Sequence, residues 1–111
     1  PAADAPAGSA TAHHYALLEA RTGSPVVRLN RAVAVAEAHG PEAGLALLEG
    51  LDEVLGESHR LAAVRGELAN RAGDDALAVA SYCLALERCA NEVEREHLRS
   101  RLDAIGPAGA P

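Results

Sequence analysis

Apolar side chains recur along this chain at intervals of three and four residues, the spacing of one face of an α-helix. The clearest stretch places leucines at positions 45, 48, 51 and 55. No segment alternates between apolar and polar residues at every second position, as a half-buried strand would. We therefore expect an all-α fold of about six helices, over residues 13–21, 25–38, 41–55, 58–72, 75–89 and 92–105.

Capping residues mark several of these helix ends. Ser24 precedes Pro25, and serine is a good N-cap while proline suits the first helical position. Asn91 is followed three residues later by Glu94, which is the spacing of a capping box. Helices are therefore predicted to begin directly after Ser24 and Asn91.

The two ends of the chain lack an apolar face. Residues 1–12 (PAADAPAGSATA) and 106–111 (GPAGAP) consist mainly of Pro, Ala and Gly. Such segments do not bury enough apolar surface to fold. We expect a flexible linker over 1–12, one helical domain over 13–105 and a flexible tail over 106–111.

A longer repeat emerges when the chain is shifted by 34 residues. Small residues then fall on small residues, and a large residue falls on a large one: the pairs are Ala32 with Gly66, Gly44 with Ala78, and Leu48 with Tyr82. This resembles the tetratricopeptide (TPR) repeat, in which small residues let two helices touch and a ring fills the gap beside them. We expect antiparallel helical hairpins stacked as a short TPR-like right-handed superhelix.

Composition and charge narrow the possible partners. Hydrophobic residues make up 49% of the chain but aromatic residues only 2%, so the core must consist mainly of Ala and Leu. The net charge is −6, whereas nucleic-acid binding requires a basic patch. No apolar run approaches the roughly 20 residues of a membrane span, and no secretory signal is visible. We expect a cytoplasmic protein with no direct nucleic-acid binding and no membrane contact.

The sequence contains no motif for catalysis or for a bound cofactor. It has no C-x-x-C, no H-x-x-x-H and no glycine-rich nucleotide loop. His13 and His14 are adjacent, so on a helix they point in different directions and are predicted to be surface histidines. Cys83 and Cys89 are separated by about 9 Å of helical rise, too far for a disulfide, and are predicted to be buried thiols. We therefore predict no enzyme, no cofactor and no metal.

Several segments resemble one known family. Residues 24–48 read SPVVRLNRAVAVAEAHGPEAGLALL, residues 59–68 read HRLAAVRGEL, and residues 76–102 read ALAVASYCLALERCANEVEREHLRSRL. The run from Tyr15 to Ile105 resembles the TPR-like C-terminal extension of bacterial extracytoplasmic-function (ECF-type) RNA polymerase sigma factors. The resemblance implies a regulatory module that modulates transcription initiation by docking on sigma-factor core domains, RNA polymerase or a regulator. The domains that read promoter DNA in that family have no counterpart in this chain.

The first helix of each predicted hairpin would line the concave face of the superhelix. The polar residues there form our candidate partner surface: Asn30, Arg31, Glu37, Arg60, Glu67, Asn70 and Arg71. One interpretation is a groove for a partner helix or peptide. The other is that these are ordinary solvated charges, with Asn30 bonding backbone between helices.

Two further alternatives concern the function and the assembly. The chain could be a generic TPR-like adaptor that binds a peptide or helix of an unrelated partner. Two and a half repeats are also close to the minimum for a stable stack, so a homodimer is a possible form.

Overall fold

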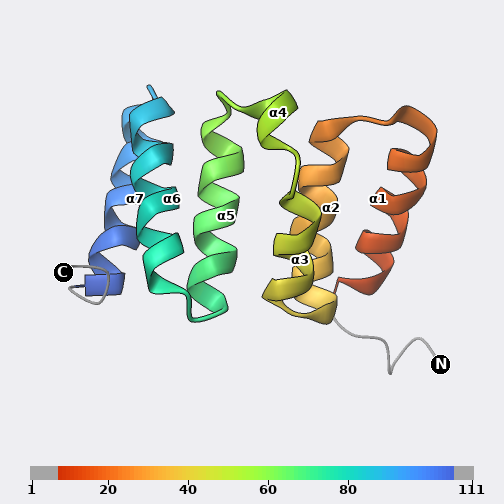
Figure 1. Cartoon of the computed structure of the whole chain (residues 1–111), viewed down its shortest axis with the longest axis horizontal. Coiled ribbons are helices and arrows are strands. Elements are labelled where there is room, and N and C mark those ends of the chain that lie inside the picture. Colours follow the sequence, from red (N-terminus) through yellow and green to blue (C-terminus); the bar gives the residue numbers. More distant parts are fainter. Residues whose placement is uncertain (1–7, 107–111) are drawn as a thin grey trace. The chain divides into compact units, whose positions relative to one another are not determined.

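The structure, a computed structural model, describes residues 8–106, and this part of the chain contains helices and no strand (Figure 1). The predicted all-α class is confirmed. The outer parts of the predicted linker and tail, residues 1–7 and 107–111, lie outside the described residues. The helices are α1 (Ser9–Thr22), α2 (Pro25–His39), α3 (Pro41–Leu48), α4 (Asp52–Leu55), α5 (His59–Arg71), α6 (Asp75–Arg88) and α7 (Glu92–Ile105).

Two predicted boundaries are wrong. Helix α1 begins at Ser9, so residues 9–12 of the predicted linker are helical; Ala12 is buried, which stabilises this first turn. The predicted helix over 41–55 is interrupted after Leu48, because Glu49 is extended and Gly50 has a φ of 83° that ends the helix. The chain then forms the short helix α4.

The chain divides into two compact units between Val54 and Leu55. In the first unit, α2 packs against both α1 and α3. In the second unit, α6 packs against both α5 and α7. Within each unit, helices that follow one another in the chain run antiparallel (Figure 1).

The 34-residue repeat is visible in the helix starts. Helices α2 and α5 begin 34 residues apart, and so do α3 and α6. The caps repeat as well: the Ser24 hydroxyl accepts a hydrogen bond from the Val27 amide at 3.3 Å, and the Ser58 hydroxyl accepts one from the Leu61 amide at 3.2 Å. The α2–α3 and α5–α6 hairpins are therefore two copies of one local design.

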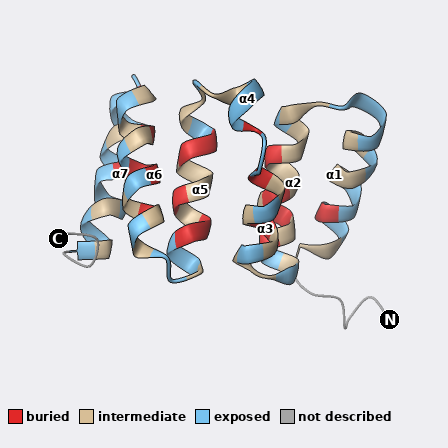
Figure 2. Ribbon diagram, in the orientation of Figure 1, coloured by how far each residue is buried: buried red, intermediate tan, exposed pale blue. Residues whose placement is uncertain are grey.

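The paired small and large positions of the repeat are buried in both hairpins (Figure 2). In the second hairpin a Cβ atom built on Gly66 would lie 3.0 Å from the ring of Tyr82. Glycine at position 66 therefore lets the ring pack directly on the backbone of α5. Tyr82, Ala85 and Cys89 of the α6 segment form a buried cluster with Ala62 of α5 and Leu98 of α7.

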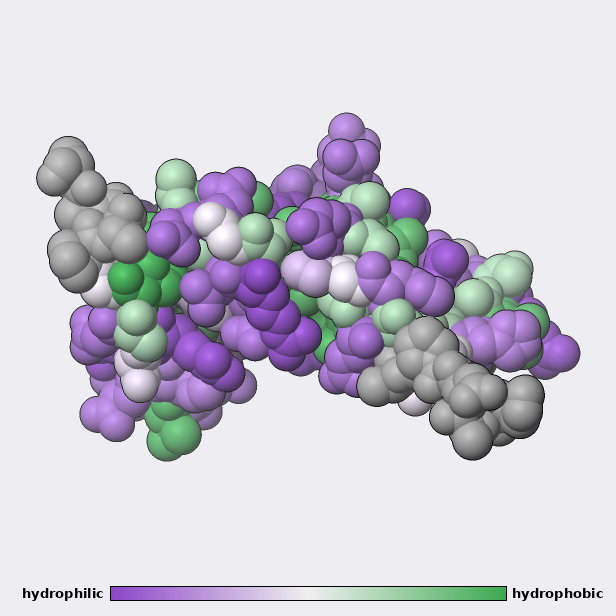
Figure 3. Space-filling model, turned by 90° about the horizontal axis from the view of Figure 1, so that it is seen from below, coloured by the Kyte–Doolittle hydropathy of each residue, from purple (hydrophilic) through white to green (hydrophobic). Residues whose placement is uncertain are grey.

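Hydrophilic side chains cover much of the face drawn in Figure 3, with apolar side chains in small separate groups. The large apolar residues that remain exposed are Leu17, Val26, Val54 and Val93. None of the described helices is both long and apolar enough to cross a bilayer.

Replacing Tyr82 with alanine should lower the free energy of unfolding by about 3–5 kcal/mol, because a buried ring is lost and a cavity remains. Tyr82→Phe keeps the ring and removes only the hydroxyl, so it should cost about 1 kcal/mol. Urea denaturation of both variants measures the difference. Equal, small effects would show that the ring is not packed as described.

Gly66→Ala tests the close contact itself. Alanine favours a helix by about 1 kcal/mol over glycine, but its methyl group would press on a buried ring, which costs about 1–3 kcal/mol. We expect a net loss of stability in the wild-type background and a gain in the Tyr82→Ala background, where the ring is absent. The same sign in both backgrounds would contradict the contact.

Candidate functional site

The predicted partner surface is divided between the two units. Its members are Asn30, Arg31 and Glu37 on α2, and Arg60, Glu67, Asn70 and Arg71 on α5. Glu37, Arg60, Asn70 and Arg71 are exposed, whereas Asn30, Arg31 and Glu67 are half-buried. The exposed members are accessible to a partner, and two of the half-buried members have structural roles that the sequence did not reveal.

Arg31 connects two helices of the first unit. Its guanidinium lies 3.1 Å from the Glu19 carboxylate on α1. The neighbouring Arg28 lies 4.0 Å from the same carboxylate and donates a hydrogen bond from Nε to the Leu47 carbonyl on α3, at 2.9 Å. These arginines therefore join α2 to both helices that pack against it.

Glu67 is the centre of a polar network in the second unit. The Tyr82 hydroxyl donates a hydrogen bond to its carboxylate at 3.0 Å. Arg71 lies 3.3 Å away on the same helix, and Arg101 of α7 lies 3.7 Å away. Glu67 is therefore engaged in contacts to α6 and α7.

The same network changes the acidity of Tyr82. Burial of the phenol raises its pKa to about 12, and the negative charge and hydrogen bond of Glu67 act in the same direction. Arg101 and Arg71 lower the pKa, but by less. The phenol therefore keeps its proton in the folded protein well above the usual range for tyrosine.

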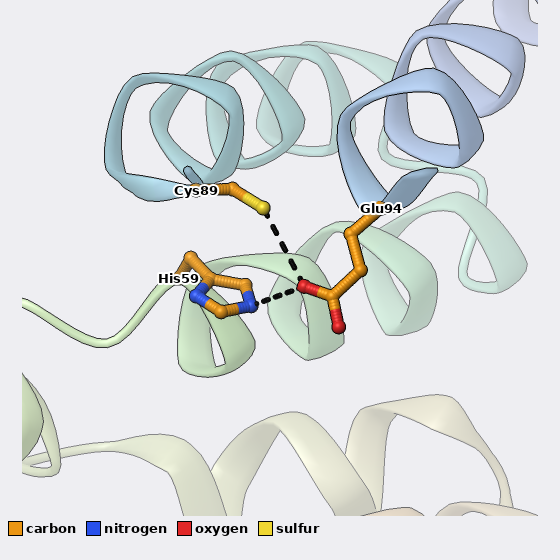
Figure 4. Close-up of side chains that lie close together, drawn as sticks. All are labelled: His59, Cys89 and Glu94. Atoms are coloured by element: carbon orange, nitrogen blue, oxygen red, sulfur yellow. Dashed lines mark hydrogen bonds and ion pairs between the residues drawn. The ribbon is translucent and has the colours of Figure 1, made fainter. Parts of the chain in front are cut away.

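A second constellation comprises His59, Cys89 and Glu94, whose side chains point toward one another in Figure 4. The imidazole Nε2 of His59 lies 2.7 Å from Oε2 of Glu94. The Cys89 thiol donates a hydrogen bond to the same oxygen, with Sγ 3.4 Å away. One donor atom from each of the three residues lies within 4.8 Å of the other two.

Helix ends place these three residues. His59 is the first residue of α5 and follows the capping serine Ser58. Cys89 is the C-cap of α6. Glu94 lies in the first turn of α7, whose N-cap is Asn91, and Asn91 Oδ1 accepts a hydrogen bond from the Glu94 amide at 3.0 Å. The three side chains meet because α5 and α7 start, and α6 stops, at the same end of this unit.

The cluster spans the boundary between core and solvent. Cys89 is only 4% exposed. The side chains of His59 and Glu94 are 39% and 55% exposed. A cavity of about 250 Å³ opens beside them, lined by His59, Arg60, Ala63, Glu94, His97 and Leu98. The site is therefore closed by a thiol on its inner side and reachable from solvent on the other.

Sequence reasoning missed this cluster, because its members are 30 and 5 residues apart and match no short motif. The predicted cap at Asn91 is confirmed, but Oε2 of Glu94 contacts His59 and Cys89, two residues that a capping box does not involve. His13 is exposed as predicted, as is His14 beside it.

The two cysteines differ from one another. Both are free thiols, and Cys89 is buried as predicted. Cys83 was also predicted to be buried, and this is wrong: it is exposed. It follows Tyr82 on α6, and a step of one residue turns a helix by about 100°. Because Tyr82 faces the core, Cys83 faces solvent.

Comparison with known proteins identifies one relative. A 91-residue stretch, 82% of this chain, is 39% identical to an uncharacterized protein of Rhizobium meliloti (strain 1021). The chain spans only 22% of the length of that protein. No family model matches the chain, and no solved structure matches it.

The raised pKa of Tyr82 predicts a stability change at high pH. The unfolded chain loses this phenol proton near pH 10, whereas the folded chain holds it until about pH 12. The unfolded state then binds fewer protons, so the free energy of unfolding falls as pH rises through this window. Urea denaturation at successive pH values measures the slope.

Tyr82→Phe should remove this part of the slope. The matched control is Tyr15→Phe, which deletes the other phenol of the chain and leaves the bond between Tyr82 and Glu67 in place. A slope that survives Tyr82→Phe unchanged would show that another group titrates.

Proposed function

We propose that this chain is a protein-interaction module that regulates transcription initiation, as the TPR-like C-terminal part of a longer ECF-type sigma factor. The observation that carries the proposal is the repeated hairpin. Its two copies share helix starts, serine caps and buried small positions at a spacing of 34 residues. Repeats of this kind present extended surfaces to other proteins.

The length of the relative supports a modular origin. Because 91 residues make up 22% of the Rhizobium meliloti protein, that protein has roughly 410 residues. This length leaves room for further domains of ordinary size. It agrees with the resemblance of residues 24–48 to the extension of a sigma factor, in which the polymerase-binding and promoter-reading domains precede the repeats.

The proposed binding surface lies on the first helix of each hairpin. In a TPR-like right-handed superhelix, α2 and α5 would line the concave face. Glu37 of α2 and Asn70 of α5 are exposed. The net charge of −6 favours a basic surface on the partner, since complementary charge speeds and orients docking. We propose sigma-factor core domains or RNA polymerase, in the cytoplasm, as that partner.

Binding of the 111-residue chain to purified sigma-factor core domains and to RNA polymerase tests the proposal. We expect binding that weakens as salt is raised, because opposite charges across the interface are screened. Deleting the region from the full-length factor should change output from its target promoter. No binding to either partner, together with unchanged transcription, would refute the proposal.

Substitutions on matched helices locate the surface. Glu37→Lys and Asn70→Lys, on α2 and α5, should lower affinity roughly tenfold, about 1.4 kcal/mol. The controls are Glu42→Lys and Glu87→Lys, at exposed positions on α3 and α6, and they should leave affinity unchanged. Equal losses in both pairs would place the surface elsewhere. Binding to an unrelated peptide with no effect on transcription would instead indicate a generic adaptor.

A further inference from the structure

We propose that His59, Cys89 and Glu94 form a binding site for a zinc ion in the second unit of the chain. This inference is independent of the proposed role in transcription. It follows from the donor atoms that three helix ends bring together beside an open cavity.

The donor set determines the class of metal. A thiolate, an imidazole and a carboxylate are the three side-chain ligands of Zn²⁺ in proteins. Mg²⁺ and Ca²⁺ take oxygen ligands and do not use a thiolate, so the presence of Cys89 argues against them. An ion pair between His59 and Glu94 alone would not require a thiol at the same oxygen, yet Cys89 Sγ lies 3.4 Å from it.

The spacing fits tetrahedral coordination after small movements. With metal–ligand bonds of about 2.0–2.3 Å, ligand atoms in a tetrahedral site lie about 3.3–3.7 Å apart. The present separations from Glu94 Oε2 are 2.7 Å to His59 and 3.4 Å to Cys89, and all three donor atoms lie within 4.8 Å of one another. His59 and Glu94 are half exposed, so their side chains are able to turn and open the gap.

Proton and charge balance are satisfied when the ion binds. The Cys89 thiol releases its proton to solvent and coordinates as a thiolate, while His59 coordinates as a neutral imidazole through Nε2. The thiolate and the Glu94 carboxylate together supply two negative charges, which balance the charge of Zn²⁺. No oxidation or reduction is involved.

Three protein ligands leave one coordination position open. That position faces the cavity of about 250 Å³ that His97 and Arg60 also line, which provides a path for the ion and space for a water molecule. On the inner side, Cys89 belongs to the buried cluster with Tyr82, Ala85 and Leu98. A bound ion would therefore connect the start of α5 to the α6–α7 turn.

Calorimetric titration of the untagged 111-residue chain with zinc, after removal of metal by a chelator, tests the site. We expect one zinc ion per chain. Since changing an outer-shell partner costs about 10–100-fold in metal affinity, His59→Gln and Glu94→Gln should lower affinity by more than about 100-fold. Both residues are partly exposed, so these variants should fold, which circular dichroism checks.

Matched controls separate the site from general attraction of cations. Glu92→Gln removes the same charge from the first turn of the same helix, and His39→Gln removes a histidine from the first unit. Both should bind zinc with unchanged affinity. Zinc should also raise the midpoint of thermal unfolding in these controls and in the wild type, but not in His59→Gln or Glu94→Gln.

Cobalt(II) substitution reports on the thiolate directly. The cobalt-loaded chain should show a sulfur-to-cobalt charge-transfer band that Cys89→Ser abolishes and Cys83→Ser retains. Absence of stoichiometric zinc binding, zinc binding that survives His59→Gln and Glu94→Gln, or a charge-transfer band that survives Cys89→Ser would each overturn the proposal.

Discussion

The contact between the ring of Tyr82 and the backbone of α5 at Gly66 is the constraint on which the second unit depends. A chain with 2% aromatic residues has few large groups to fill a core, so its helices must approach closely. Gly66 permits this approach, because any side chain there would meet the ring at about 3.0 Å. Once α5 and α6 are set in this way, the hydroxyl of the same tyrosine reaches Glu67. Packing and polar contacts are thus specified by one residue.

Polar residues of both units serve first as connections between helices. In the first unit, Arg28 and Arg31 of α2 share Glu19 of α1. In the second, Glu67 of α5 contacts Tyr82 of α6 and Arg101 of α7. Charged residues at helix contacts are partly desolvated and paired, so replacing one disturbs its partners as well. Exposed residues such as Glu37 and Asn70 are therefore the better probes of an interaction surface.

Helix ends, and not helix faces, form the most reactive part of the molecule. His59, Cys89 and Glu94 each lie at the first or last turn of a helix, where caps hold the backbone and side chains can converge from several directions. Cys89 is inert by burial on one side and exposed to ligands of the opposite chemistry on the other. Cys83, six residues earlier on the same helix, contacts solvent and none of these groups has it as a neighbour in the cluster.

The sequence by itself determined the helices and the local repeat. Apolar spacing, the caps at Ser24 and Asn91, and the pairing of Ala32 with Gly66 are local properties, since each depends on residues within a few turns or on one fixed shift. It could not place the break at Gly50, because glycine inside an apolar helical pattern is compatible with either outcome. Only the tertiary structure decided that Glu67 joins three helices and that His59 meets Cys89 and Glu94. These residues are far apart in the chain, and helix packing alone brings them together.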